Sequence, residues 1–245
     1  MLAGFGAGIL TSSVGVASLL SFPVLLAVGI PPVVANVSNT IGLIPAGIGG
    51  AVGFRDELRE EPALTRRVVV LTGIAGAAGA VLLLALPETV FEAIVPWLIL
   101  GTCLLVGVQP RLSSWLAARR GGGQRYALSP TTTVFVLLTG LYGGYFGAGA
   151  GVLMIAVLAL GLDVAFRVIA AIRTTSVMAA NVVAGLVFAA VAHVDWLVVV
   201  LLAGGSMVGG YVGARVARRL PATLLRTLIV VAGVVAAALL WTGTV

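Results

Sequence analysis

The chain has 245 residues, of which 60% are hydrophobic and only 9% are charged, against the roughly 25% charged residues of an ordinary soluble domain. So little charge could not cover a water-exposed globule of this size, which excludes a soluble enzyme. The single histidine and single cysteine exclude a His/Cys metal site and a disulfide framework, and no cofactor is expected. The net charge of +6 comes from arginines between apolar runs, which favours membrane topology over nucleic-acid binding.

Eight apolar segments follow one another along the chain: 1–30, 33–54, 68–86, 89–108, 131–161, 164–192, 196–214 and 222–244. A hydrocarbon core of about 30 Å needs about 20 apolar helical residues, so six segments predict single transmembrane helices. Segments 1–30 and 131–161 are too long for one straight span, too short for two, and rich in glycine near their middles. We predict that each is a broken hairpin of two half-helices that enters the membrane and leaves on the same side. Eight simple transmembrane helices are the alternative.

The arginines discriminate between these two topologies. Eleven of the 14 lie in three polar loops, 55–67, 109–130 and 215–219, whereas loops 87–92 and 193–195 contain none. Basic loops of membrane proteins stay in the cytoplasm. Eight full spans would put loops 55–67 and 215–219 on opposite sides. Two re-entrant hairpins put all three basic loops inside and both arginine-free loops outside, so the pattern favours the hairpin topology, with both termini outside.

The two halves of the chain resemble one another. Residues 35–40 (ANVSNT) align with residues 170–175 (AAIRTT) at an offset of 135, and Gly15 meets Gly147 at an offset of 132. Each half then contains one broken hairpin and three spans, and because three is odd the halves must have opposite orientations. Inverted repeats with broken helices are typical of secondary transporters. The predicted fold is therefore an all-α polytopic membrane protein of two inverted repeats, 1–108 and 131–245, joined by a basic cytoplasmic linker, 109–130.

Arg173 is the arginine that neither a polar loop nor a span end explains. It lies about ten residues, or roughly 15 Å of helix, beyond the loop at 161–163, which places it near the middle of the bilayer. An arginine there costs about 2.5–3.5 kcal/mol on insertion scales, so it indicates a functional site. A buried ion pair with Asp163 or Asp195 is the structural alternative, although neither carboxylate is well placed. Arg167 is only about one turn inside its span, where snorkelling explains it.

Hydroxyl and amide side chains follow Arg173 and recur at the pseudo-equivalent positions 36–40. Such side chains often only join helices by hydrogen bonds, but their clustering in both halves beside a mid-membrane cation favours a lining for a polar solute. A half-helix that begins after each hairpin tip would add N–H groups and the positive end of its dipole. Together with the planar fork of arginine, these groups suit a carboxylate, sulfonate or other oxyanion. The predicted substrate-binding residues are Arg173, Thr174, Thr175, Asn36, Ser38, Asn39, Thr40, Ser12, Ser13, Gly15, Gly147, Gly149 and Gly151.

Several stretches resemble the TauE/SafE family of sulfite exporters. Residues 13–23 (SVGVASLLSFP) and 29–40 (GIPPVVANVSNT) are similar to its first repeat. Residues 142–149 (YGGYFGAG), Arg173 and residues 193–196 (HVDW) are similar to its second repeat. The resemblance covers nearly the whole chain and is most specific around the prolines and the ANVSNT stretch. It implies an integral membrane permease that moves sulfur-containing anions and organic acids, with Arg173 at a position where relatives often have lysine.

The sequence predicts a secondary transporter for a small oxyanion such as sulfite or an organosulfonate, in a bacterial-type cytoplasmic membrane. Its expected partners are that anion and the lipid bilayer, without nucleic acid, and homodimer formation stays open. A passive anion channel and a non-transporting membrane scaffold are the alternatives. An intramembrane enzyme is not expected, because no intramembrane serine has a histidine or acidic partner.

Overall fold

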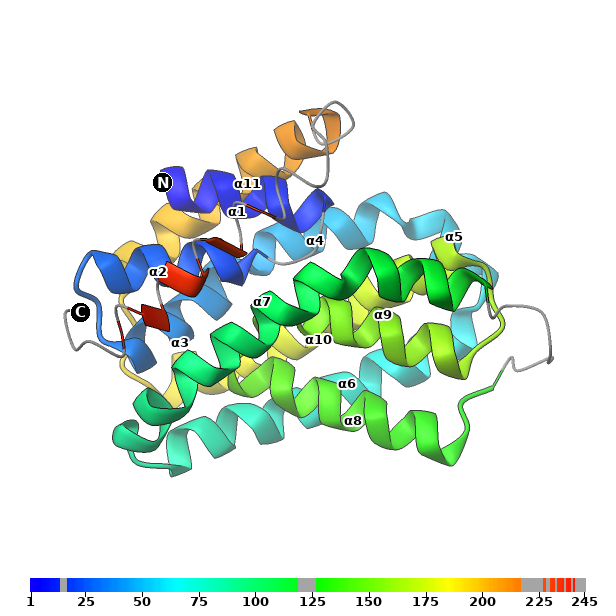
Figure 1. Ribbon diagram of the computed structural model, residues 1–245, viewed down its shortest axis with the longest axis horizontal. Helices are drawn as coiled ribbons and strands as arrows, with labels where there is room; N and C mark the ends of the chain where they lie inside the picture. The colour runs from blue at the N-terminus through cyan, green and yellow to red at the C-terminus, as the bar shows by residue number, and fades with distance from the viewer. Residues whose placement is uncertain are drawn as a thin grey trace.

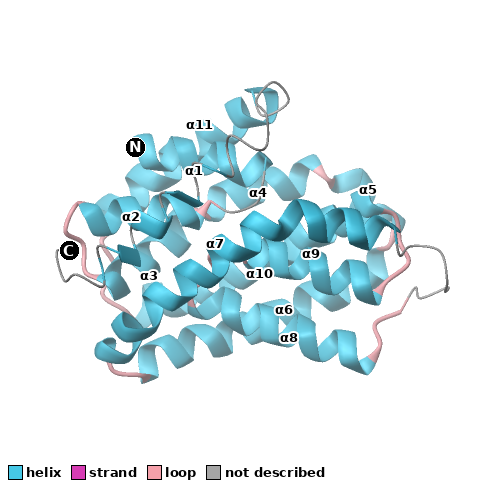
Figure 2. Ribbon diagram, viewed as in Figure 1, coloured by secondary structure: helices cyan, strands magenta, loops and turns pink. Residues whose placement is uncertain are grey.

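The computed structural model describes residues 1–13, 17–118 and 127–216, with short helical pieces between residues 227 and 240. Throughout this part of the chain the secondary structure is helical, without strands (Figures 1 and 2). The helices are α1 (Leu2–Ser13), α2 (Ser18–Ala27), α3 (Pro32–Gly42), α4 (Ile44–Gly53), α5 (Arg55–Glu60), α6 (Pro62–Ala85), α7 (Glu88–Ala118), α8 (Pro130–Tyr145), α9 (Ala150–Gly161), α10 (Phe166–Val191) and α11 (Trp196–Val216).

Four helical stretches among these residues are long and apolar enough to cross a membrane: Pro32–Gly53, Pro62–Ala85, Glu88–Gln109 and Phe166–Val191. Shorter apolar helices accompany them at Ser18–Ala27, Ala150–Gly161 and Trp196–Gly209. The prediction of an all-α polytopic membrane protein is therefore confirmed. The last predicted span, 222–244, falls largely outside the described residues.

Each of the two overlong apolar segments consists of two short helices, as predicted. The ten residues of α2 extend about 15 Å, roughly half the hydrocarbon core. Between α8 and α9 the chain turns at Gly147 and Gly149, whose φ angles of 78° and 76° favour residues without a Cβ atom. Residues 14–16, between α1 and α2, lie outside the described part of the chain.

Three boundaries differ from the sequence prediction. The polar loop 55–67 contains α5 and the first turn of α6, and α7 continues to Ala118, well into the predicted linker. Hydropathy marks where the hydrocarbon ends, whereas arginine, glutamate and leucine sustain a helix beyond that point. The predicted span 33–54 is divided at Leu43, because Pro45 lacks an N–H group and its ring crowds the preceding turn.

Packing between the two halves is reciprocal. Helix α1 of the first half packs along α11 of the second, and α8 of the second half packs along α6 of the first. Glycines permit both approaches: a Cβ atom on Gly209 would overlap the carbonyl of Phe5, and one on Gly144 would overlap the carbonyl of Gly76. Helix α10 lies against both α6 and α4, so it contacts the first half along much of its length.

The connections gather at two ends of the molecule. In Figure 1 the α6–α7 and α10–α11 connections lie at the left, whereas α5 and the α9–α10 connection lie at the right. At the right end Arg167 forms a bidentate ion pair with Glu60 of α5, with N–O distances of 2.7 and 2.9 Å. At the left end the backbone N–H of Asp195 donates to Ser38 Oγ at 3.0 Å.

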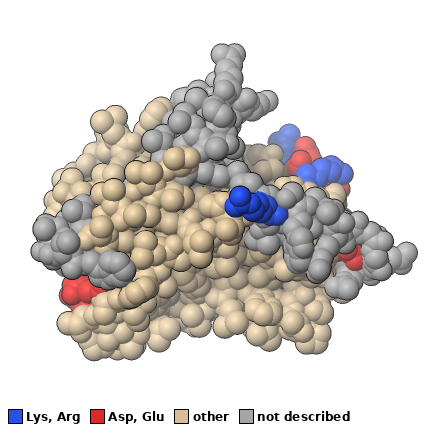
Figure 3. All heavy atoms as spheres, in the orientation of Figure 1, with Lys and Arg blue, Asp and Glu red and all other residues tan. Residues whose placement is uncertain are grey.

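Charge is distributed unevenly between these ends. The arginines in view lie in the half that carries α5, while the opposite end shows only acidic residues among its charged ones (Figure 3). Among the described residues, the arginines of α5 therefore lie apart from the acidic residues of the opposite end, in the same sense as the charge asymmetry of membrane proteins.

Candidate functional site

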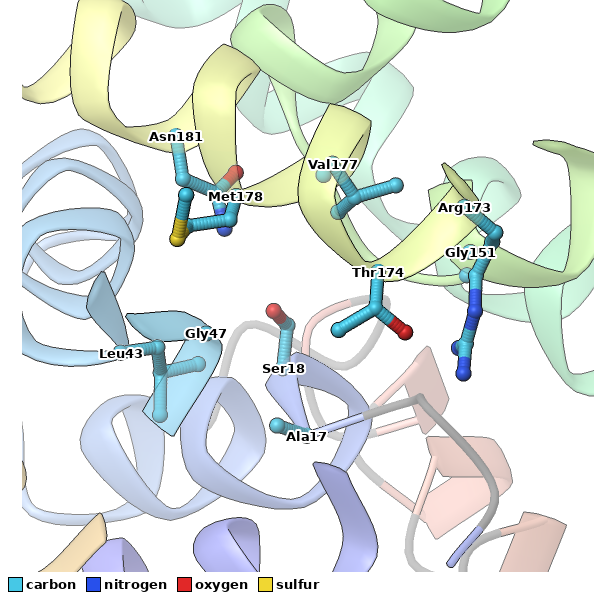
Figure 4. A pocket seen from close by; sticks show the side chains of 12 residues that line it. Ala17, Ser18, Leu43, Gly47, Gly151, Arg173, Thr174, Val177, Met178 and Asn181 are labelled. Atoms are coloured by element: carbon cyan, nitrogen blue, oxygen red, sulfur yellow. The ribbon is translucent and has the colours of Figure 1, made fainter. Parts of the chain in front are cut away.

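A cavity of about 70 Å³ lies where the starts of two half-helices meet the middle of α10 (Figure 4). The N-terminus of α2 and the tip between α8 and α9 form part of its wall, and the bend between α3 and α4 forms another part. Its lining residues are Ala17, Ser18, Leu43, Gly47, Gly147, Gly149, Gly151, Arg173, Thr174, Val177, Met178 and Asn181. The lining therefore combines both halves of the chain.

Arg173 supplies the formal charge of this lining. Its side chain is half-buried, and its Nε atom is buried without a hydrogen-bond partner. The ion pairs among the described residues involve Arg55, Arg59 and Arg167, and none joins Arg173 to a carboxylate. Asp195, a partner considered from the sequence, instead accepts a hydrogen bond from Val198 N at the start of α11. A mid-helix cation therefore faces the cavity without a counter-ion from the described protein.

Two helix N-termini border the same cavity. Helix α9 begins at Ala150, directly after the left-handed Gly149, and α2 begins at Ser18, directly after Ala17. No side chain caps either helix. The first turn of a helix has N–H groups without intrahelical partners and carries the positive end of the dipole. Together with Arg173 these two starts give the cavity a positive potential.

A hydrogen-bond cluster from α7 and α8 holds the second tip. The hydroxyl of Tyr142 donates to the carbonyl of Ala148 at 2.5 Å and lies 3.0 Å from Thr102 Oγ1, which is itself 3.2 Å from that carbonyl. The Thr102 side chain occupies the place where a Cβ atom on Gly149 would lie. Helix α7 thereby fixes the backbone that presents the N-terminus of α9 to the cavity.

The cavity brings together five of the residues predicted as binding residues: Arg173, Thr174, Gly147, Gly149 and Gly151. Thr175 is not part of the lining, and its hydroxyl donates to the carbonyl of Ala171 at 3.1 Å. Gly15 and the side chains of Ser12 and Ser13 lie outside what the structure describes.

The polar residues of the first half are placed differently. Asn36, Ser38, Asn39 and Thr40 are all buried, and none lines the cavity. Asn36 Nδ2 donates to the carbonyl of Tyr145 at 2.9 Å, and Ser38 accepts from Asp195 N. Asn39 Oδ1 accepts from the Ser21 hydroxyl at 2.5 Å. Asn36, Asn39 and Ser38 thus join α3 to α8, α2 and the α10–α11 connection, whereas Thr40 donates to the carbonyl of Asn36 within α3.

Sequence reasoning missed several lining residues. Ser18, Gly47 and Asn181 were not predicted, nor were the apolar Leu43, Val177 and Met178. A signal for part of this set was present, since residues 174, 177, 178 and 181 follow the helical spacing of one face. Leu43 and Met178 also stand 135 residues apart, which is the offset of the repeat.

Comparisons with known proteins agree with this architecture. The family model described as "Sulfite exporter TauE/SafE" matches residues 1–240. The chain is 29% identical to "Probable membrane transporter protein ORF9" from Sinorhizobium sp., over 95% of this chain and 87% of that protein. It is 26% identical to "Probable membrane transporter protein YfcA" from Escherichia coli K12, over 97% of this chain and 85% of that protein.

A further relative is a "Probable membrane transporter protein" from Haemophilus influenzae, 24% identical over 93% of this chain and 88% of that protein. No solved structure matches the chain. The family match spans nearly all of the sequence, and the names of these relatives describe them as probable membrane transporters. With its long apolar helices, this protein is therefore a multi-pass transporter of the cell membrane and belongs to the TauE/SafE family.

Proposed function

We propose that the chain is a secondary transporter that moves small oxyanions, such as sulfite or an organosulfonate, across the cytoplasmic membrane. The observation that carries the proposal is Arg173, a mid-helix cation without a carboxylate partner among the described residues, which faces a cavity bordered by two helix N-termini. Ionisable residues inside a membrane are costly and usually functional. An anion would neutralise this charge, because guanidinium matches oxyanion geometry and N–H groups of helix starts donate to oxygens.

Alternating access is the expected mechanism, with two inverted repeats that rearrange around the cavity. Reciprocal packing supports the repeat, since α1 lies on α11 and α8 lies on α6. The same relation connects Leu43 and Met178, which line the cavity from equivalent places in the two halves. Arg173 and the helix N-termini would hold the anion while the two repeats move.

The outer side of the cavity favours a transporter over an open channel. Helix α3 runs from Pro32 at the outer connection to the bend at Leu43 on the cavity wall. Its residues 36–40 therefore lie between the two, and all of them are buried. The bonds Asn36–Tyr145 and Ser38–Asp195 join the two halves on the side that is predicted to face outward, so an outward-open state would have to break or move them.

Radiolabelled sulfite flux in proteoliposomes tests the proposal. We expect Arg173→Ala to lower flux at least tenfold, since a charge-assisted hydrogen bond is worth about 1.5–3 kcal/mol. Arg167→Ala is the matched control: it removes an arginine from the same helix, but one whose partner is Glu60 at the molecule's end. It should leave flux near that of the parent protein.

Unchanged flux in Arg173→Ala would overturn the site. If the parent protein transports neither sulfite nor sulfonates, the proposed substrate class is wrong. Unitary currents in planar bilayers, instead of slow saturable flux, would favour the passive anion channel.

A further inference from the structure

We propose that the cavity selects small monovalent anions with one apolar end over divalent anions of the same size. This inference rests on the proposed function, because the site is the same one. It follows from the free energy required to desolvate a divalent anion, from the apolar part of the cavity wall and from the volume of the cavity.

Desolvation favours an anion with a single negative charge. Arg173 is the formal charge among the residues that line the cavity, and the helix starts of α2 and α9 add at most about half a charge each, so the lining supplies between one and about two positive charges. Attraction to these groups grows in proportion to the charge of the anion. The free energy required to remove the anion from water grows with the square of its charge, so a dianion doubles the attraction but quadruples the desolvation.

The wall opposite the arginine is mostly apolar, and Asn181 beside Met178 is its polar residue. In Figure 4 Arg173 and Thr174 lie on one side of the space, while Leu43 and Met178 lie on the other. An anion whose oxygens face Arg173 would direct its remaining substituent toward Leu43, Val177 and Met178. A methyl group gains apolar contact there, whereas the fourth oxygen of a sulfate ion would exchange several hydrogen bonds to water for at most the amide of Asn181.

The volume restricts the length of the anion. A cavity of about 70 Å³ accommodates roughly five to seven water-sized groups. Helix α4 limits any expansion, since a Cβ atom on Gly47 would lie 2.9 Å from Met178 Cγ, and one on Gly50 would lie 2.8 Å from Thr174 Cγ2. In this state the site therefore suits an anion such as methanesulfonate, with about five non-hydrogen atoms.

Methanesulfonate and sulfate form a matched pair of probes, because they share a tetrahedral sulfur and differ by a methyl group in place of one charged oxygen. We expect radiolabelled methanesulfonate to enter proteoliposomes at pH 7 with at least tenfold higher uptake efficiency than sulfate. Hexanesulfonate, whose ten non-hydrogen atoms exceed the capacity of the cavity, should compete at least fivefold more weakly than methanesulfonate. The uptake of methanesulfonate and the uptake of sulfate should both require Arg173.

Two variants test the apolar wall. Met178→Gln and Leu43→Gln each add an amide of similar size, and we expect either to lower the methanesulfonate-to-sulfate ratio at least threefold. Met207→Gln is the control, because Met207 is 64% exposed on α11 and should leave the ratio unchanged. Leu43 lies between α3 and α4, whereas Met178 lies on α10. If one of the two variants fails to fold, the other still tests the apolar wall.

The outcomes separate this inference from the proposed function. If sulfate uptake depends on Arg173 and equals methanesulfonate uptake, the proposed selectivity is wrong. The proposed function as an anion transporter is then unaffected. A ratio that both glutamine variants leave unchanged would overturn the role of the apolar wall. Failure of the parent protein to move any of these anions, sulfite included, would overturn both proposals.

Discussion

Two polar stretches at equivalent places in the two halves have different surroundings. Residues 36–40 on α3 and residues 173–175 on α10 belong to stretches that the sequence aligns at an offset of 135 residues. In the first stretch Asn36, Ser38 and Asn39 form hydrogen bonds with residues of other elements. In the second, Thr174 and Thr175 donate only to carbonyls one turn earlier on their own helix, and Arg173 retains an unpartnered Nε.

The difference in hydrogen-bond partners distinguishes residues that hold helices together from residues that can bind a solute. A side chain whose polar atoms bond with another helix stabilises the packing, since the lipid offers no other partner. A polar side chain that faces a cavity and lacks such a partner is available to a solute. Substitutions that are identical in chemistry should therefore affect folding in one stretch and transport near the other.

The largest contrast is expected from the same isosteric change at two asparagines. Asn36→Asp replaces the amide that donates to the Tyr145 carbonyl with a carboxyl group at a position that is 1% exposed. We expect it to destabilise the protein by more than about 2 kcal/mol, because a buried donor is lost and a carboxyl must be buried. Unfolding by denaturant in mild detergent measures the loss.

Asn181→Asp is the counterpart on the cavity wall. Asn181 is half-buried and shares the cavity with Arg173, so a carboxylate there gains an opposite charge. We expect stability within about 1 kcal/mol of the parent protein but at least tenfold lower anion flux, since the new carboxylate competes with the substrate. Equal destabilisation by both variants would show that the cavity wall tolerates a carboxylate no better than the buried position of Asn36.

The sequence was sufficient for the features that depend on local chemistry. Hydropathy and glycine content predicted the helices and the breaks in segments 1–30 and 131–161. The membrane cost of a central arginine singled out Arg173, which lines the cavity. Helical periodicity from Thr174 would have added Met178 and Asn181, had it been applied.

The roles of the first polar stretch could not be predicted, because its partners are distant in sequence. Asn36 binds Tyr145 and Ser38 binds Asp195, residues 109 and 157 positions away. Composition and spacing contain no information on such contacts. The length of α7 was also missed, because helical hydrogen bonding does not stop where hydrophobicity does.

A smaller effect is expected from two adjacent threonines. Thr174 lines the cavity and Thr175 does not, yet both hydroxyls make the same bond to a carbonyl one turn earlier. Thr174→Val should lower anion flux about 3- to 10-fold, the equivalent of one neutral hydrogen bond, while Thr175→Val should stay within about twofold. Flux in proteoliposomes measures both, and the unfolding of the two variants should shift alike. Equal loss of flux would remove Thr174 from the site.

The smallest effect is expected at Ser38, where only one bond is at stake. Ser38→Ala removes the acceptor for Asp195 N and should lower the free energy of unfolding by about 0.5–1.5 kcal/mol. Because Ser38 is fully buried away from the cavity, the KM for the anion should remain that of the parent protein. Denaturant unfolding and saturation of flux give the two quantities. A changed KM with unchanged stability would place Ser38 among the binding residues and would remove the distinction between the two stretches.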